Sequence, residues 1–192
     1  LGLLSGSFLP DEMTEKLRTY CRHRITLIEA SSIAIRRMQK FLHLLNLRLD
    51  VVVNDIVGLT GMRILDAICQ GESDGDKLSE HRHGNCKKSK EEIAKALQSN
   101  GREDYLFGLK QELAQYKYLQ KQIIQCDKEI EKQLKRHLKK RKLTHFEKIP
   151  LKVHKKVNKN APQNIDLNQI AYQYFNGVDL MAIEGVSHAT II

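Results

Sequence analysis

The hydrophobic positions between residues 102 and 142 recur with the seven-residue period of a coiled coil. Polar Gln120 and Asp127 interrupt this seam at d positions, where a polar side chain costs stability but fixes register or partner choice. No Pro or Gly follows Gly108 in this stretch, so the pattern predicts one helix of about 35 residues, roughly 50 Å long. A helix of this length needs a partner, and the apolar seam residues are the expected oligomerisation residues: Leu106, Leu109, Leu113, Tyr116, Ile123, Ile130 and Leu134.

A second long helix is predicted after Pro10, where Asp11 and Glu12 supply the acidic first turn. From Leu17 to Leu49 the apolar residues recur at steps of mostly three and four, which is the period of an amphipathic helix. Two long helices joined by compact material predict a mainly α fold, an antiparallel coiled-coil hairpin or bundle followed by the start of a small helical domain. The basic residues largely off the apolar stripe are expected to face outward: Arg18, Arg22, Arg24, Arg36, Arg37 and Lys40.

The segment between the two long helices contains a glycine-rich turn. Val51–Val53 is too short to assign as a strand, and the spacing of Gly58 and Gly61 among apolar residues resembles a helix-hairpin-helix turn, whose backbone N–H groups can bind a phosphate. A plain turn between two helices explains these glycines equally well. We expect a short helix from Met62 to Cys69, ended by Gly71.

Residues 71 to 88 are expected to form a loop. His81, His83 and Cys86 have the residue types of a metal site, but no fourth ligand stands at a usual spacing, so an exposed loop is the preferred interpretation. Ser89 and Glu92 form the pattern of a capping box, which predicts a helix from 91 to 98 closed by Asn100-Gly101.

Past Lys142 the period fades, and Pro150 and Pro162 interrupt any regular element. Leu167–Phe175 then has the pattern of an amphipathic helix stopped by Asn176-Gly177. Because the chain starts without Met and stops in an apolar run, we expect it to be a piece of a longer protein. The predicted segments are a segment with a long helix, a short-helix connector, a coiled-coil helix, a basic linker and the start of a C-terminal domain, at 1–50, 51–101, 102–142, 143–164 and 165–192.

Positive charge is concentrated in one stretch of the chain. Of a net charge of +9, residues 132–159 contribute twelve Lys and Arg against Glu147 alone. Such a local field is typical of phosphate contacts with DNA or RNA, although a solvated helix face with an ordinary basic linker is the alternative. From Lys135 to Lys142 no Asn/Gln pairs or aromatic residues are interleaved with the charges, so we expect positioning contacts without base readout. The expected nucleic-acid contacts are a main stripe, Lys135, Arg136, Lys139, Lys140, Arg141 and Lys142, and further basic residues, Arg36, Arg37, Lys40, Lys87, Lys88 and Lys90.

Other features narrow the class of protein. The four cysteines form no CxxC pair, which favours a reducing cytoplasm, and no stretch approaches 18 consecutive apolar residues, so no membrane span is expected. The sequence contains no Gly-rich nucleotide loop, no G-x-S-x-G elbow and no HExxH. We therefore expect no catalytic residue and no metal site in this chain.

Several runs resemble the middle of transposases of the insertion-sequence 110/116/902 family. The most specific block lies between Asp55 and Leu97. The matching runs are residues 42–49, 55–62, 71–72, 86–97, 102–103, 106–111 and 125–131.

The resemblance implies a part of a larger enzyme, in which residues 1–50 are the last helical part of a RuvC-like N-terminal domain. Members have a RuvC-like domain whose four acidic residues hold a divalent metal, magnesium, then a coiled-coil insert and a C-terminal domain with a serine nucleophile. The third and fourth acids would precede Leu1 and the serine would follow Ile192, so Ser5 and Ser7 take no catalytic role here. The family's Gly-apolar-Gly-Pro turn, expected near nucleic acid, corresponds to Gly185, Val186 and Ser187 with His188 in the last place.

The implied partners are DNA of the element ends and of the target, a structured guide RNA and further copies of the chain, with no membrane, in the bacterial cytoplasm at the nucleoid. On this interpretation the chain is the part of a DNA transposase that binds nucleic acid and forms oligomers. It contains none of the catalytic residues. The alternative is a structural coiled-coil adaptor without a nucleic-acid function.

Overall fold

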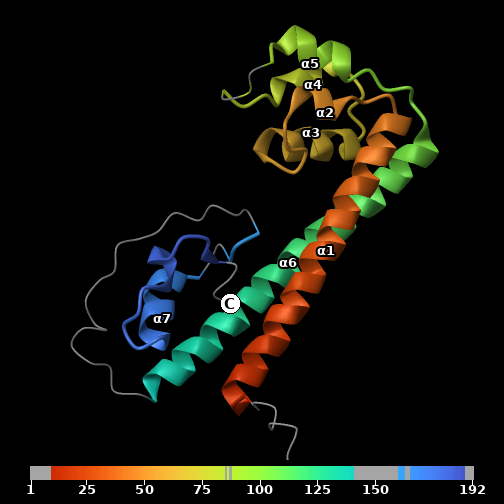
Figure 1. Cartoon of the computed structure of the whole chain (residues 1–192). Coiled ribbons are helices and arrows are strands. Elements are labelled where there is room, and N and C mark those ends of the chain that lie inside the picture. The colour runs from red at the N-terminus through yellow and green to blue at the C-terminus, as the bar shows by residue number, and fades with distance from the viewer. Residues whose placement is uncertain (1–9, 85, 87, 141–159, 163–164, 189–192) are drawn as a thin grey trace, which may run out of the picture. The chain divides into compact units, whose positions relative to one another are not determined.

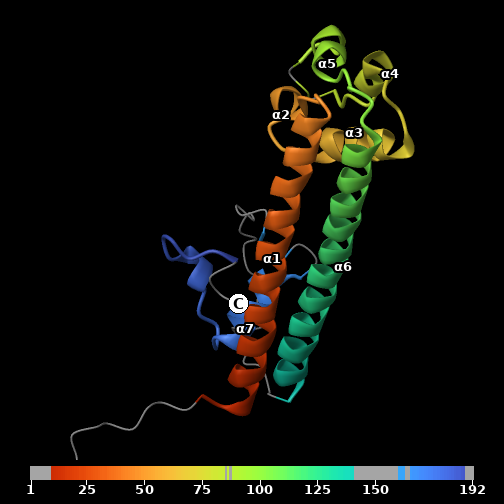
Figure 2. The same ribbon diagram turned by 90° about the vertical axis from the view of Figure 1, so that its right-hand side faces the viewer.

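The computed structural model describes residues 10–84, 86, 88–140, 160–162 and 165–188. Within these ranges the regular elements are helices, and the extended pairing is an isolated antiparallel bridge between Leu47 and Leu97. The long helix α1 packs against the long helix α6, which confirms the mainly α prediction (Figures 1 and 2). The helices are α1 (Glu12–Leu44), α2 (Leu49–Val52), α3 (Leu59–Gln70), α4 (Gly75–Glu80), α5 (Lys90–Ala96), α6 (Glu103–Lys139), α7 (Leu167–Tyr174) and the 3₁₀ helix η2 (Leu180–Ala182).

The chain divides into two compact units, and each contains part of α1 and part of α6. The central unit is Glu29–Gln120, and the terminal unit combines Leu1–Ile28 with Lys121–Ile192. Both boundaries fall inside the long helices α1 and α6, so the units do not follow the order of elements along the chain.

In the central unit, α2 to α5 gather at the C-terminal end of α1 (Figure 1). Each helix contributes fully buried apolar side chains to one core, among them Leu42, Leu65, Leu78, Ile93 and Leu109. Burying a side chain of this size stabilises the fold by roughly 1.5–3 kcal/mol. The short helices therefore depend on this shared core, because an isolated helix of so few residues is not stable in water.

Helix α1 ends at Leu44, earlier than the predicted end at Leu49. The next residues leave the helix because Asn46 adopts the left-handed conformation, with φ of 62°. Asn100 then caps the helix end: its backbone N–H donates to the carbonyl of Leu45 at 3.0 Å, and its side-chain Nδ2 donates to the carbonyl of Leu44 at 2.8 Å. Asn100 lies outside the helix α5 that it was expected to close, since α5 ends at Ala96.

Two short helices correct the expectations for the connector. Residues 49–52 form α2, a single helical turn, and the predicted loop 71–88 contains α4. The Asp74 side chain caps α4 by accepting from the backbone N–H of Asp76 at 3.0 Å. A Cβ at Gly75 would overlap the carbonyl of Ala94, so a glycine is required where α4 and α5 make close contact.

In the terminal unit, α7 packs on the last turns of α6. Leu167 and Ile170 from α7 meet Ile130, Leu134 and Leu138 from α6 in a second apolar core. The amphipathic helix expected after residue 165 is thus present, and its apolar face covers α6. No helix in the described ranges has an apolar stretch long enough to cross a membrane.

Candidate nucleic-acid interface

The last two turns of α6 separate apolar from basic residues. Leu134 and Leu138 are buried in the terminal core, whereas the side chains between and after them, Lys135, Arg136, Lys139 and Lys140, are exposed. Lys135 and Lys139 are one helical turn apart, as are Arg136 and Lys140, so the four charges form a stripe on the solvent side. We call these four residues the basic stripe; the expected contacts Arg141 and Lys142 lie outside the described residues.

The basic stripe is only partly neutralised. Lys135 pairs with Glu131 at 2.8 Å, while Arg136 and Lys139 make no ion pair with another described residue. Lys140 contributes, after the larger effect of a hydrogen bond from Lys16, to holding the pKa of Glu12 below its usual value. A surplus of positive charge therefore remains for an external anion.

Three aromatic rings accompany the basic stripe. The His137 ring lies 5.3 Å from the Tyr174 ring, measured between centroids, and Tyr174 lies 5.2 Å from Phe175 in an edge-to-face arrangement. Apart from His137, the expectation that no aromatic residues are interleaved with these charges holds along the chain. In space, Tyr174 and Phe175, at the end of α7 and just after it, lie beside His137. We call these three residues the ring cluster.

The other expected basic contacts belong to the central unit. Arg36, Arg37 and Lys40 are exposed on α1, and Arg37 lies 3.6 Å from a carboxylate oxygen of Glu112. Lys90 is exposed, and Lys87 lies outside the described residues.

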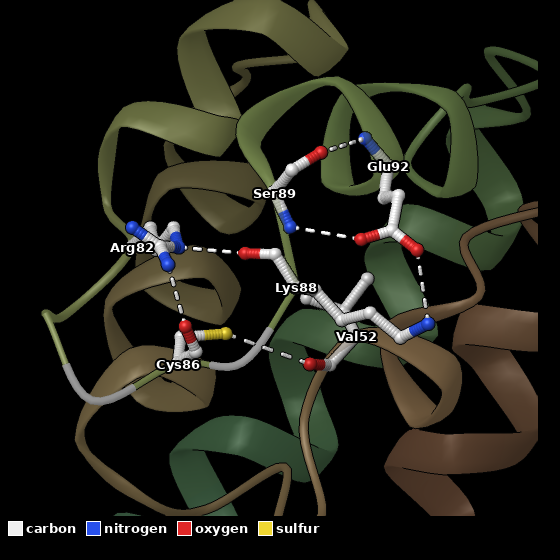
Figure 3. Close-up of polar contacts among 6 residues, drawn as sticks. All are labelled: Val52, Arg82, Cys86, Lys88, Ser89 and Glu92. Atoms are coloured by element: carbon white, nitrogen blue, oxygen red, sulfur yellow. Dashed lines mark hydrogen bonds and ion pairs between the residues drawn. The ribbon is translucent and has the colours of Figure 1, made fainter.

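Lys88 belongs to a local network that holds the loop before α5 (Figure 3). Its ammonium group pairs with Glu92 at 3.0 Å, and its carbonyl accepts from Arg82 at 2.7 Å. Arg82 also donates to the carbonyl of Cys86 at 2.6 Å. The predicted capping box is confirmed, since Ser89 and Glu92 each accept from the other's backbone N–H. The network gives Lys88 a structural role, and the sequence contained no sign that Arg82 organises the loop.

The metal and phosphate interpretations of the connector gain no geometric support. The Cys86 thiol donates to the carbonyl of Val52 at 3.7 Å, and the described residues contain no group of three His, Cys, Asp or Glu side chains that could hold a metal ion. Gly58 precedes α3 as its N-cap, and a Cβ at Gly61 would overlap the backbone of Ile56. Close packing of a plain turn therefore accounts for Gly61.

The C-terminal turn adopts a conformation that suits glycine. Gly185 is exposed and has φ of 82°, and the backbone N–H of Val186 donates to the carbonyl of Ile183 at 3.1 Å. Val186 and Ser187 are half-buried, and His188 is buried.

The seam of α6 faces α1 of the same chain. In the central unit Leu109 and Leu113 are buried, with Leu106 and Tyr116 half-buried against them, and in the terminal unit Ile123, Ile130 and Leu134 are buried. The polar seam residue Gln120 donates to the hydroxyl of Ser31 on α1 at 2.8 Å. A single chain thus buries most of the seam residues that were expected to join copies of the chain.

Arg24 corrects the expectation that the basic residues of α1 face outward. It is buried, and its guanidinium binds the buried carboxylate of Asp127, the second polar seam residue, and the carbonyl of Asn160 at 2.7 Å. A buried charge needs a partner of opposite sign, so the Asp at a d position was the available signal for a cation on the facing helix.

Comparisons with protein-family models, with curated proteins and with solved structures give no significant match. The assignment of a function consequently depends on the sequence motifs and on the geometry of the basic stripe.

Proposed function

We propose that this chain is the nucleic-acid-binding and assembly part of a DNA transposase similar to the insertion-sequence 110/116/902 family. The observation that supports it best is the basic stripe, where Arg136 and Lys139 are exposed without an ion-pair partner among the described residues. The sequence motifs that match the family supply the biological context.

The chemistry of the basic stripe suits a phosphate backbone. Lys and Arg side chains at one-turn spacing neutralise successive phosphates and release the counterions condensed on them. The stripe itself contains no Asn or Gln side chain to read base edges, so it positions the nucleic acid. Specificity for element ends, target and guide RNA belongs to other parts of the assembly.

The proposal assigns no chemical step to this chain. Among the described residues there is no group of three His, Cys, Asp or Glu side chains for the divalent metal implied by the resemblance, and the proposal routes no step through that metal. Assembly with further copies remains part of the proposal, and the burial of the seam within one chain favours another surface for it.

A salt titration tests the proposal. Affinity of the chain for duplex DNA and for a structured RNA is measured by fluorescence anisotropy over a series of salt concentrations. We expect log affinity to fall linearly with log salt, with a slope of about −0.9 per neutralised phosphate on duplex DNA. The absence of binding, or binding with a flat response, contradicts the proposal and favours the structural coiled-coil adaptor.

A further inference from the structure

The ring cluster lies at the same end of α6 as the basic stripe. His137 stands next to Arg136 in sequence, and Lys140, the first residue after α6, donates its backbone N–H to the carbonyl of His137 at 3.1 Å. Through His137 the stripe is continuous with Tyr174 and Phe175. All three residues are partly exposed.

Packing fixes one side of the ring cluster. Tyr174 and Phe175 line a small apolar cavity of about 40 Å³ together with Leu17, Ile130 and Leu134. This cavity is too small for a nucleobase, so a base can meet the rings only on their solvent side. The rings are held by the core, and a base stacking on them would cost little additional ordering of the protein.

We propose that the ring cluster is a stacking platform for unpaired bases, so that the ligand of this end of α6 is a single-stranded stretch of nucleic acid. The inference depends on the proposed function, because the basic stripe must hold the phosphates. Aromatic rings stack on any base that is not already stacked within a helix, and cationic side chains beside them hold the backbone. A duplex offers the same phosphates but keeps its bases inside.

Matched oligonucleotides separate phosphate binding from base stacking. An oligothymidylate and an abasic oligomer of equal length carry the same backbone charge, and only the first carries bases. We expect the chain to bind the oligothymidylate more tightly at every salt concentration, with the same salt slope for both.

Variants of the rings locate the effect. Tyr174→Leu and Phe175→Leu keep apolar bulk over the cavity and remove a ring. Each is expected to weaken oligothymidylate binding about 5- to 100-fold while leaving the abasic affinity and the salt slope unchanged. Tyr118→Leu is the control, because Tyr118 is exposed on α6 in the central unit. Thermal melting of each variant shows whether α7 stays packed, and the Phe175 variant carries the test if the Tyr174 variant unfolds.

The outcomes distinguish the two proposals. Equal affinity for the oligothymidylate and the abasic oligomer, unchanged in folded ring variants, overturns the stacking platform and leaves the proposed function standing. A loss of affinity for both oligomers in the ring variants assigns the rings a structural role and also overturns the platform. If neither oligomer nor duplex DNA binds, the proposed function fails, and the platform fails with it.

Discussion

At the scale of single residues, the basic stripe and Arg141, which follows it in the sequence, predict a specific loss of electrostatic binding. We expect the combined change Lys139→Gln, Lys140→Gln and Arg141→Gln to weaken binding about equally across DNA sequences, because phosphates carry no sequence information. The salt slope should fall in magnitude by roughly two to three, about one per lost phosphate contact.

A matched control removes charge from the same helix. Lys121 and Lys128 are exposed on α6, and changing both to Gln should leave the slope close to that of the original chain. Anisotropy titrations at several salt concentrations measure both variants. Weakened binding to one sequence alone, at an unchanged slope, would show that the stripe reads bases.

The buried pair of Arg24 and Asp127 predicts that removing one charge lowers the free energy of unfolding more than removing both. Asp127→Leu leaves the Arg24 charge buried without its partner, and we expect a loss of about 3–5 kcal/mol in the free energy of unfolding. Replacing both residues, Arg24→Met with Asp127→Leu, removes the uncompensated charge and should recover much of this loss.

Urea denaturation of the original chain, the Asp127→Leu variant and the double variant measures the three free energies of unfolding. The exposed pair of Lys16 and Glu12 is the control, since breaking it should cost little. A double variant that is no more stable than Asp127→Leu would show that the Arg24 charge does not depend on its partner.

At the scale of elements, we expect a change in the seam to lower the stability of the chain without changing its oligomeric mass. Ile123 is buried, so Ile123→Asp places a charge in the seam and should cost a few kcal/mol of stability. If the seam serves only the pairing of α1 with α6, the mass measured by light scattering stays the same while the melting temperature falls. The neighbouring exposed residue gives the control Ile124→Asp. A drop in mass in the folded Ile123 variant would show that copies of the chain also share this seam.

The length of an element decided how much of it could be predicted. The two long helices repeat their apolar pattern over many turns, so the repeat identifies them, whereas α2 and α4 are shorter than two helical turns and show no period. The polar seam residues Gln120 and Asp127 indicated that polar groups face them on a partner helix, but the sequence did not identify these groups. Arg24 was misplaced because burial of a charge depends on the facing helix, and the ring cluster was missed because α7 is distant in sequence.

At the scale of the whole molecule, the thiols predict a loss of stability in alkaline solution. Burial raises the pKa of Cys21 from 9.0 to about 11, and burial also raises the pKa of Cys126. The folded chain therefore holds these protons more tightly than the unfolded chain, which stabilises it below pH 9. This contribution is lost as the pH rises from 9 to about 11.

Comparison with a variant isolates this effect from other groups that titrate in the same range. The difference in melting temperature between the original chain and Cys21→Ala should shrink as the pH rises from 9 to about 11. A difference that stays constant over this range would show that the thiol ionises equally in the folded and unfolded chains.

The contact between the end of α1 and the segment just before α6 has a kinetic consequence. The bridge Leu47–Leu97 and the cap by Asn100 close a loop of about fifty residues, which costs about 3.5 kcal/mol of chain entropy. Once this loop is closed, each further turn of α1 and α6 in the central unit can pair at a much smaller cost in chain entropy. The pairing of these helices is therefore expected to start at this end. Asn100→Ala should slow refolding in stopped-flow measurements more than it speeds unfolding, and the reverse partition would place the start of pairing elsewhere.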